Sequence, residues 1–294
     1  MKKIIALAVA SAFVAPVWAA DVTLSGDIEM QWISEDGEGL ATANNDGDIT
    51  VNATEELANG LTVSAKVSVE DVQTAAGAGD VELHISGSFG QLSLGEVDSA
   101  AQSVDERDPA SDLFGEAGVG SIAVPGAVAP INTIRYTLPT LVNGLTAMAS
   151  AGHLAVTDDQ NPDNEVVVTS YAAQYTAGGL TVAAGVLEAD SQAYDATYVG
   201  ASYVMGSLTF SAERTSNDGA DNQDTQTIGV RYNLGDTAVY AQSDETETAA
   251  GASTTDSIVG LSHSIGGGLS VRVENLSSDT VNNDATGVAV IYAF

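Results

Sequence analysis

Short, glycine-marked turns and long, acidic connections alternate along the chain without a break. The short turns read ELANG, GSFG, PTLVNG, TAGG, VMGS, LGDT and IGGG, at residues 56–60, 87–90, 139–144, 176–179, 204–207, 234–237 and 265–268. The long connections are expected near residues 34–48, 71–80, 99–131, 153–165, 188–196, 215–225, 243–257 and 277–285. Together they separate 16 segments. This alternation predicts a sheet with all its short turns at one end and all its long loops at the other.

Within the segments, apolar and polar residues alternate with a period of two, which indicates β-strands with two different faces. The first segment, VTLSGDIEMQW, separates its residues into an apolar and a polar face: Val22, Leu24, Ile28, Met30 and Trp32 against Thr23, Ser25, Asp27, Glu29 and Gln31. Charged residues such as Lys66 and Arg231 stand in mid-segment between apolar neighbours. Each predicted strand therefore needs an apolar environment on one side and water on the other.

A β-sandwich would account for the alternation but not for the asymmetry between turns and loops. After the N-terminus no apolar run approaches 18 residues, so no transmembrane helix is expected, whereas strands of a membrane barrel carry a weaker hydropathy signal. The chain has no cysteine, so an exported protein of this length must be stabilised by a large core or by closed backbone pairing in place of disulfides. We predict an all-β fold, a 16-stranded antiparallel transmembrane β-barrel.

The two ends of the chain support export and closure. Residues 1–19 carry Lys2 and Lys3, an apolar middle and small residues around Ala19, as in a cleaved signal peptide, which leaves 20–294 as the barrel. The last segment, ATGVAVIYAF, ends on an apolar face that would be an aggregation hazard unless it pairs with the first strand. We expect Tyr292 and Phe294 to face lipid or the membrane interface.

The charge balance limits the partners. The chain has 40 acidic and 8 basic side chains, a formal net charge of −32. This argues against nucleic acid and anionic lipid surfaces and favours cations, although a saline habitat would select for the same excess.

The connection at 99–131 is too long and too apolar near its end for an ordinary solvated loop. Because a barrel of about 16 strands encloses an aqueous lumen, such a loop can fold inward and narrow it. The alternative is a flap on the outer surface.

Several stretches resemble the general Gram-negative outer-membrane porins of the trimeric, 16-stranded type. They are ATEELANGLTVSAKVSVE (53–70), HISGSFGQLSLGEVDSA (84–100), NTIRYTLPTLVNGL (132–145) and the aromatic C-terminus. The resemblance covers essentially the whole chain after the signal peptide. It implies a homotrimer in the cell outer membrane, surrounded by lipid, through which small hydrophilic solutes and ions diffuse past an inward-folded third loop. It also makes Tyr292 and Phe294 the signal read by the barrel assembly machinery.

The resemblance implies two sets of pore residues. The acids of the constriction loop would be Asp98, Asp105, Glu106, Asp108, Asp112 and Glu116. The pore wall would carry Asp27, Glu29, Lys66, Glu96, Arg135, Arg231, Arg272 and Glu274. Glu96 and Asp27 stand where the family often has bases, so the basic wall is thin and we expect a preference for cations.

Other chemistry has little support. The three histidines are far apart and no thiols are present, so we expect no cofactor and no zinc or iron site. No G-x-S-x-G turn presents a nucleophile, so we expect no enzyme activity. The acidic stretches 158–165 and 218–224 could hold calcium, but solvated external loops are the simpler interpretation. A substrate-specific outer-membrane channel and a secreted β-rich surface or binding protein remain the alternative functions.

Overall fold

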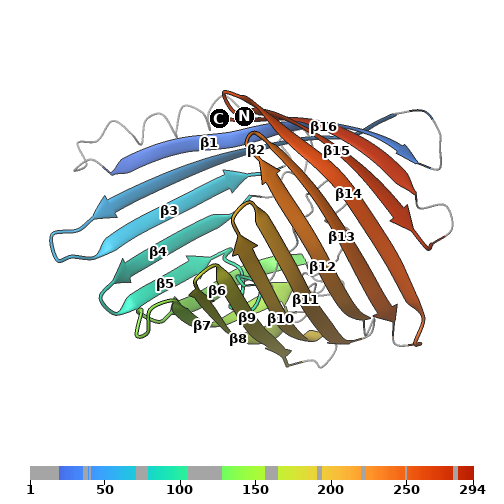
Figure 1. Ribbon diagram of the computed structural model, residues 1–294. Coiled ribbons are helices and arrows are strands. Elements are labelled where there is room, and N and C mark those ends of the chain that lie inside the picture. Colours follow the sequence, from blue (N-terminus) through green and yellow to red (C-terminus); the bar gives the residue numbers. More distant parts are fainter. Residues whose placement is uncertain are drawn as a thin grey trace.

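A computed structural model describes residues 20–35, 39, 41–70, 79–104, 128–155, 165–190, 194–219, 223–248, 250–280 and 284–294. They form sixteen strands (Figure 1): β1 Asp21–Glu35, β2 Ala41–Glu56, β3 Thr62–Val69, β4 Val81–Gly87, β5 Gly90–Gly95, β6 Val128–Thr137, β7 Leu145–Ala155, β8 Glu165–Ala177, β9 Leu180–Ala189, β10 Tyr194–Met205, β11 Leu208–Gly219, β12 Gln223–Leu234, β13 Thr237–Thr248, β14 Ser253–Gly266, β15 Leu269–Ser278 and β16 Ala285–Ala293. Among these residues no helix is both long and apolar enough to cross a membrane.

The strands close into one antiparallel barrel in which each strand pairs with its neighbours in sequence and β1 pairs with β16. The first and last strands therefore meet at one seam, at the top of Figure 1. The register of the seam runs from Asp27 opposite Ala293 to Glu35 opposite Ala285. The predicted fold class is confirmed, and the exposed edge that the C-terminal strand would have offered is absent.

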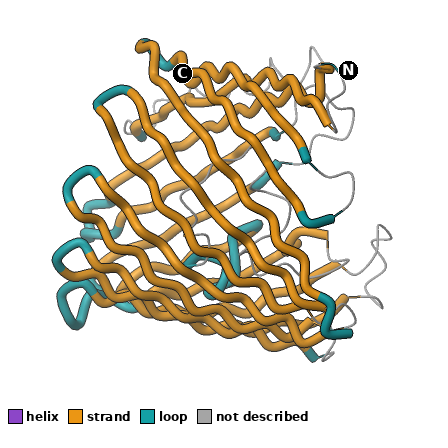
Figure 2. The backbone as a smooth tube through the Cα atoms, turned by 45° about the vertical axis from the view of Figure 1, so that its right-hand side comes forward, coloured by secondary structure: helices purple, strands orange, loops and turns teal. Residues whose placement is uncertain are grey.

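The short turns lie together at one end of the barrel, at the left in Figure 2. At the opposite end of the barrel, the strands extend further than the alternation of turns and loops predicted. For example, β2 already begins at Ala41, β13 continues to Thr248 and β14 begins at Ser253, all inside ranges that we expected to be loops. Acidic and polar residues are compatible with strand pairing where the barrel projects into water, so composition placed these loop boundaries wrongly.

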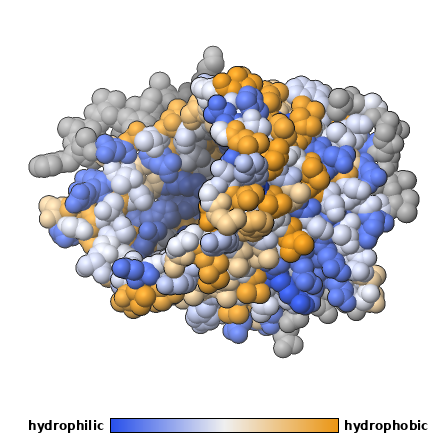
Figure 3. Space-filling view, in the orientation of Figure 1, coloured by the Kyte–Doolittle hydropathy of each residue, from blue (hydrophilic) through white to orange (hydrophobic). Residues whose placement is uncertain are grey.

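The two faces of the strands differ in polarity. The large exposed hydrophobic side chains include Leu24 (62% exposed), Ile134 (56%) and Val259 (61%), which face outward. The strand register places Asp27, Lys66 and their polar neighbours on the opposite face, toward the lumen. Figure 3 shows a hydrophilic hollow between surfaces rich in hydrophobic residues. Apolar side chains thus face outward and polar side chains face inward, the reverse of an ordinary globular protein. This is the arrangement expected of strands that separate lipid from a water-filled lumen.

Outward-facing aromatic residues gather at the short-turn end of the strands: Phe89, Tyr136, Tyr175, Tyr203, Phe210, Tyr232, Tyr292 and Phe294. Amphipathic rings at this level form one of the two interfacial girdles of a membrane barrel. Tyr198 and Tyr240, which sequence alone could also have assigned to a girdle, are instead buried on the inward face, each only 3% exposed.

A glycine makes room for the last residue at the seam. The backbones of Gly26 and Phe294 exchange two hydrogen bonds, of 3.1 and 2.9 Å. A Cβ on Gly26 would lie 2.8 Å from the ring atom Cζ of Phe294, so the terminal ring occupies the space that a larger residue would fill. Tyr292 stacks on the same ring, with 6.1 Å between centroids. The last strand therefore ends in a stacked pair of aromatic rings, and the ring of Phe294 packs against Gly26 of β1.

Candidate functional site

The chain enters the lumen immediately after β5. Residues 96–104 lie inside the barrel, and residues 99–104 pack against the inward face of β7 to β10 (Figure 2). The N–H of Ala100 donates to the Ser150 hydroxyl at 2.9 Å, and the N–H of Ala101 donates to the Ser170 hydroxyl at 2.8 Å. Two strands of the wall thus satisfy backbone donors that would otherwise be buried without partners.

The contact between this segment and the wall excludes water. Ala100 and Ala101 are fully buried, and Val104 is 2% exposed. They pack on a patch of small and aliphatic residues from β8 to β10, namely Val168, Ala172, Ala183, Leu187 and Ala196, together with Tyr198. Gly185 lies beneath the segment, and a Cβ there would come within 2.8 Å of the Cβ of Ala101. This glycine lets the segment approach the wall closely, so the segment covers the apolar patch and keeps the water of the lumen away from it.

The wall formed by β1 to β4 has the opposite character. Asp27 lies directly opposite Asp48, and Glu29 lies directly opposite Asp46, all four on the inward face. Like charges in such positions repel each other and destabilise the sheet. The repulsion is tolerable where water and mobile cations can screen it, and the four side chains are only partly buried.

Lys66 of β3 links the acids on the same wall. Its ammonium lies 2.7 Å from a Glu82 carboxylate oxygen and 3.5 Å from Asp80. The other oxygen of Glu82 lies 3.0 Å from Nε2 of His84, whose Nδ1 lies 2.9 Å from the Ser93 hydroxyl. Lys66 is therefore largely neutralised by its neighbours and contributes little free positive charge to the lumen.

Arg135 of β6 joins the wall to the start of the inserted segment. Its guanidinium donates to the backbone carbonyl of Asp98 at 3.0 Å. The Asp98 side chain remains accessible to water, yet many protein atoms surround it inside the barrel. This desolvation raises the pKa of Asp98, with a smaller contribution from Glu82 and Asp80 and an opposing one from Arg135. Desolvation and the nearby Asp80 also raise the pKa of Glu70, just after β3.

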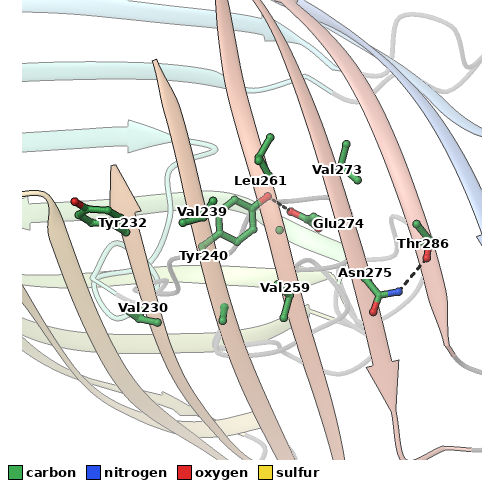
Figure 4. Close-up of a pocket in the computed structure, with 12 residues that line it drawn as sticks. Val230, Tyr232, Val239, Tyr240, Val259, Leu261, Val273, Glu274, Asn275 and Thr286 are labelled. Atoms are coloured by element: carbon green, nitrogen blue, oxygen red, sulfur yellow. Dashed lines mark hydrogen bonds between the residues drawn. The ribbon is translucent and has the colours of Figure 1, made fainter. Parts of the chain in front are cut away.

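On the far wall, Tyr240 of β13 organises a basic residue. Its hydroxyl donates to Glu274 at 2.6 Å, a contact drawn in Figure 4. Its ring lies across Gly260, where a Cβ would overlap the ring. The Arg231 guanidinium lies 5.2 Å from the ring centroid and donates to Ser262 at 3.1 Å. Arg231 is thus held in place by a ring that is itself fixed by Glu274, a buried carboxylate two strands from Tyr240.

Apart from Asp98, which is described above with Arg135, the predicted pore residues fall into three groups. Asp27, Glu29, Lys66, Arg135, Arg231, Arg272 and Glu274 occupy inward positions of the wall. Glu274 is only 1% exposed, so its carboxylate is an internal hydrogen-bond acceptor. Glu96 is bound to the backbone, since its carboxylate accepts from the N–H of Val81 at 2.8 Å. Asp105, Glu106, Asp108, Asp112 and Glu116 lie outside the described residues.

Sequence reasoning missed the residues that hold the inserted segment. Ser150, Ser170 and Gly185 are ordinary members of alternating strands, and no local pattern distinguishes them. Asp46 and Asp48 were assigned to a loop because they follow an acidic stretch. The sequence does carry a signal for these two residues, because both fall on the polar positions of the period-two pattern when β2 is extended toward its N-terminal end.

No group of three or more histidine, cysteine or carboxylate side chains among the described residues is arranged to hold a metal ion. In the stretch 218–224, Asp224 is already bound by Arg214 at 2.5 Å and by the Ser216 hydroxyl. Residues 158–164 lie outside the described part of the chain.

Comparison with known proteins gives a consistent result. The sequence model of the Gram-negative porin family matches residues 6–285. A search of curated protein sequences gave no match. Among solved structures, a porin refined at 1.8 Å resolution is similar, with 18% identity, a TM-score of 0.72 and coverage of 93% of this chain and 100% of that one. A loop-deletion variant of OmpT, an outer-membrane protein of Vibrio cholerae, has 17% identity, a TM-score of 0.72 and coverage of 94% and 100%. A variant of the Rh. blastica porin has 20% identity, a TM-score of 0.67 and coverage of 93% and 100%.

Proposed function

Because the chain belongs to the Gram-negative porin family, we propose that it is a general diffusion pore of the outer membrane that prefers cations. The observation that carries this proposal is the open inner wall of β1 to β4. There Asp27, Glu29, Asp46 and Asp48 line the lumen, whereas the nearby Lys66 is paired with Glu82 and Asp80. Low-dielectric walls focus the field of such a cluster and raise the local concentration of cations.

Selection in this pore is by size and charge, without a chemical step. The inserted segment after β5 reduces the cross-section on the side of β7 to β10, and solutes pass along the charged side. Ions interact with carboxylates that water also reaches, so that binding is weak enough for release. The preference should decrease in high salt, because the screening length falls from about 10 Å at 0.1 M to about 3 Å at 1 M.

Two alternative functions have less support. A substrate-specific channel needs a track of accessible aromatic or bidentate groups, but the inward-facing Tyr198 and Tyr240 are both 3% exposed. A secreted β-rich binding protein would not present an outward belt of large apolar side chains and a closed barrel.

The proposal extends to maturation and assembly. We propose that residues 1–19 are removed on export, that the chain forms a homotrimer, and that Tyr292 and Phe294 serve as the signal for the assembly machinery. Deletion of Phe294 should sharply lower the amount of heat-modifiable barrel in the membrane fraction, while the copies that assemble keep their conductance. Unchanged membrane levels would remove Phe294 from this role.

Liposome swelling tests the diffusion function. Vesicles that contain the purified protein should swell in isosmotic solutions of small neutral sugars, at rates that fall steeply with sugar size. Saturable uptake of one sugar would instead favour a substrate-specific channel. Absence of swelling with folded, reconstituted protein would contradict the proposal.

A further inference from the structure

The contact between the inserted segment and the wall includes one sulfur atom. Sδ of Met148, on β7, lies 2.9 Å from the hydroxyl of Ser103 in the segment. The same hydroxyl lies 2.8 Å from the backbone carbonyl of Ala100. Because a hydroxyl has a single proton, it donates to one of these acceptors at a time, and the thioether is the weaker acceptor. Met148 therefore touches the segment without holding it by a strong hydrogen bond.

Met148 differs from the other methionines in its surroundings. Met30 and Met205 point away from the lumen and are 40% and 53% exposed. Of the methionines that the structure describes, Met148 alone faces inward, directly opposite Ala172 of β8. It is partly buried and packs against the dry cluster that the segment forms with β8 to β10. The segment thus covers one side of the thioether, and the part that stays accessible faces the lumen.

A thioether in this position is open to oxidation by hydrogen peroxide, a small uncharged solute that enters a water-filled lumen. A lone pair of Sδ attacks one peroxide oxygen, the O–O bond breaks and an S–O bond forms. The second oxygen takes up the proton of the first and leaves as water. The sulfur loses two electrons and the peroxide gains them. The product is methionine sulfoxide, which is polar and larger by one oxygen atom.

The added oxygen conflicts with the packing of the segment in two ways. It needs space beside Sδ, where the Ser103 hydroxyl already lies, and a close-packed contact takes up an extra atom only by displacement. It also accepts hydrogen bonds better than the thioether, so it competes with the Ala100 carbonyl for the hydroxyl proton. Both changes weaken the contact between the segment and β7.

We propose that Met148 is a site of reversible oxidation by hydrogen peroxide, and that its sulfoxide displaces the inserted segment from the wall and narrows the lumen. Methionine sulfoxide reductases restore the thioether, one enzyme for each epimer of the sulfoxide. This modification goes beyond the diffusion function, which enters only as one of the readouts.

Peptide mass mapping and planar-bilayer recording of the full-length protein, folded in detergent and treated with dilute hydrogen peroxide, test the proposal. Met148 should gain one oxygen atom, and the single-channel conductance should fall, with more frequent closures. Treatment with both reductases should restore the original mass and conductance. The amide hydrogens of Ala100 and Ala101, which are bound to serine hydroxyls of the wall, should exchange faster with solvent in the oxidised protein.

Three variants separate Met148 from the other methionines. Met148→Leu, which nearly keeps the volume but removes the sulfur, should conduct like the wild type and stay unchanged by peroxide. Met148→Gln, which places a polar side chain against the segment, should show the lowered conductance before any treatment. The double variant Met30→Leu and Met205→Leu is the matched control and should respond to peroxide as the wild type does. Heat-modifiable migration confirms that each variant folds.

Unchanged conductance after complete oxidation of Met148 would overturn the proposal, and so would unchanged amide exchange of Ala100 and Ala101. It is equally overturned if Met148→Leu responds to peroxide like the wild type, or if peroxide modifies Met30 and Met205 but not Met148. Mass mapping and hydrogen exchange need no conduction, so their failure is distinguishable from a failure of the diffusion function.

Discussion

The inner wall of the barrel has two regions of opposite character. On β7 to β10 it is dry, built from small and aliphatic residues, and covered by the segment that follows β5. On β1 to β4 it is open, and carboxylates face one another across neighbouring strands. The strands of both regions show the same alternation of inward and outward residues. The regions differ in what their inward side chains contact, which is the segment after β5 in one case and water in the other. A lumen can hold an apolar patch where the chain covers it, and a cluster of like charges where water and ions reach it.

The largest effect is expected where the covered wall is disturbed. A Cβ at position 185 would lie only 2.8 Å from the Cβ of Ala101. The side chain of Gly185→Val should therefore overlap Ala101 and push the segment into the lumen. Single-channel conductance should drop clearly with more frequent closures, and the free energy of unfolding should fall by about 1–3 kcal/mol. Ala173→Val, on the outward face of the adjacent strand β8, is the control. Equal conductance in the two variants would show that the covered wall does not control the opening.

The open wall should respond in selectivity and not in conductance. Asp27→Asn combined with Asp48→Asn removes two accessible carboxylates, each worth about 1 kcal/mol to a cation 4 Å away in water. The ratio of potassium to chloride permeability should fall by a factor of about two to five. Glu274→Gln, which changes a buried acid on the inward face, should have a smaller effect. If the buried acid matters more, the distinction between accessible and internal carboxylates is wrong.

Acidification should act first on the carboxylates whose pKa is raised. Asp98 and Glu70 bind protons at a higher pH than ordinary carboxyls, so their charge is present well above that pH and is lost early as the pH falls. Cation preference should begin to decline before the other acids titrate. Asp98→Asn should remove the early part of this decline in a series of reversal potentials. A profile identical to that of the wild type would separate Asp98 from the conducting path.

The smallest effect on transport is expected at Tyr240. Tyr240→Phe removes the hydroxyl that donates to Glu274 but keeps the ring beneath Arg231. The change should lower the free energy of unfolding by about 1–3 kcal/mol because a buried acceptor loses a donor. Selectivity should stay close to that of the wild type. A large change in selectivity would show that the hydroxyl, and not the ring, positions Arg231.

The alternation of turns and loops was enough to predict the strand number and the barrel, and the period of two within the strands was enough to predict which face Lys66 and Arg231 occupy. Both patterns are local properties of the sequence. The covered wall could not be predicted, because Ser170 and Gly185 acquire their role only when Ala101, distant in the sequence, lies against them. The burial of Glu274 likewise depends on Tyr240 two strands away. Local pattern shows which face a residue occupies but not what covers that face.

The reversal potential of the wild-type protein in a planar bilayer under a gradient of KCl tests the central claim most directly. At low ionic strength, where screening is weakest, the sign should correspond to a preference for potassium over chloride, and the magnitude should decrease as salt is raised. A potential of the opposite sign would contradict the assignment of the open acidic wall as the part of the lumen that selects ions.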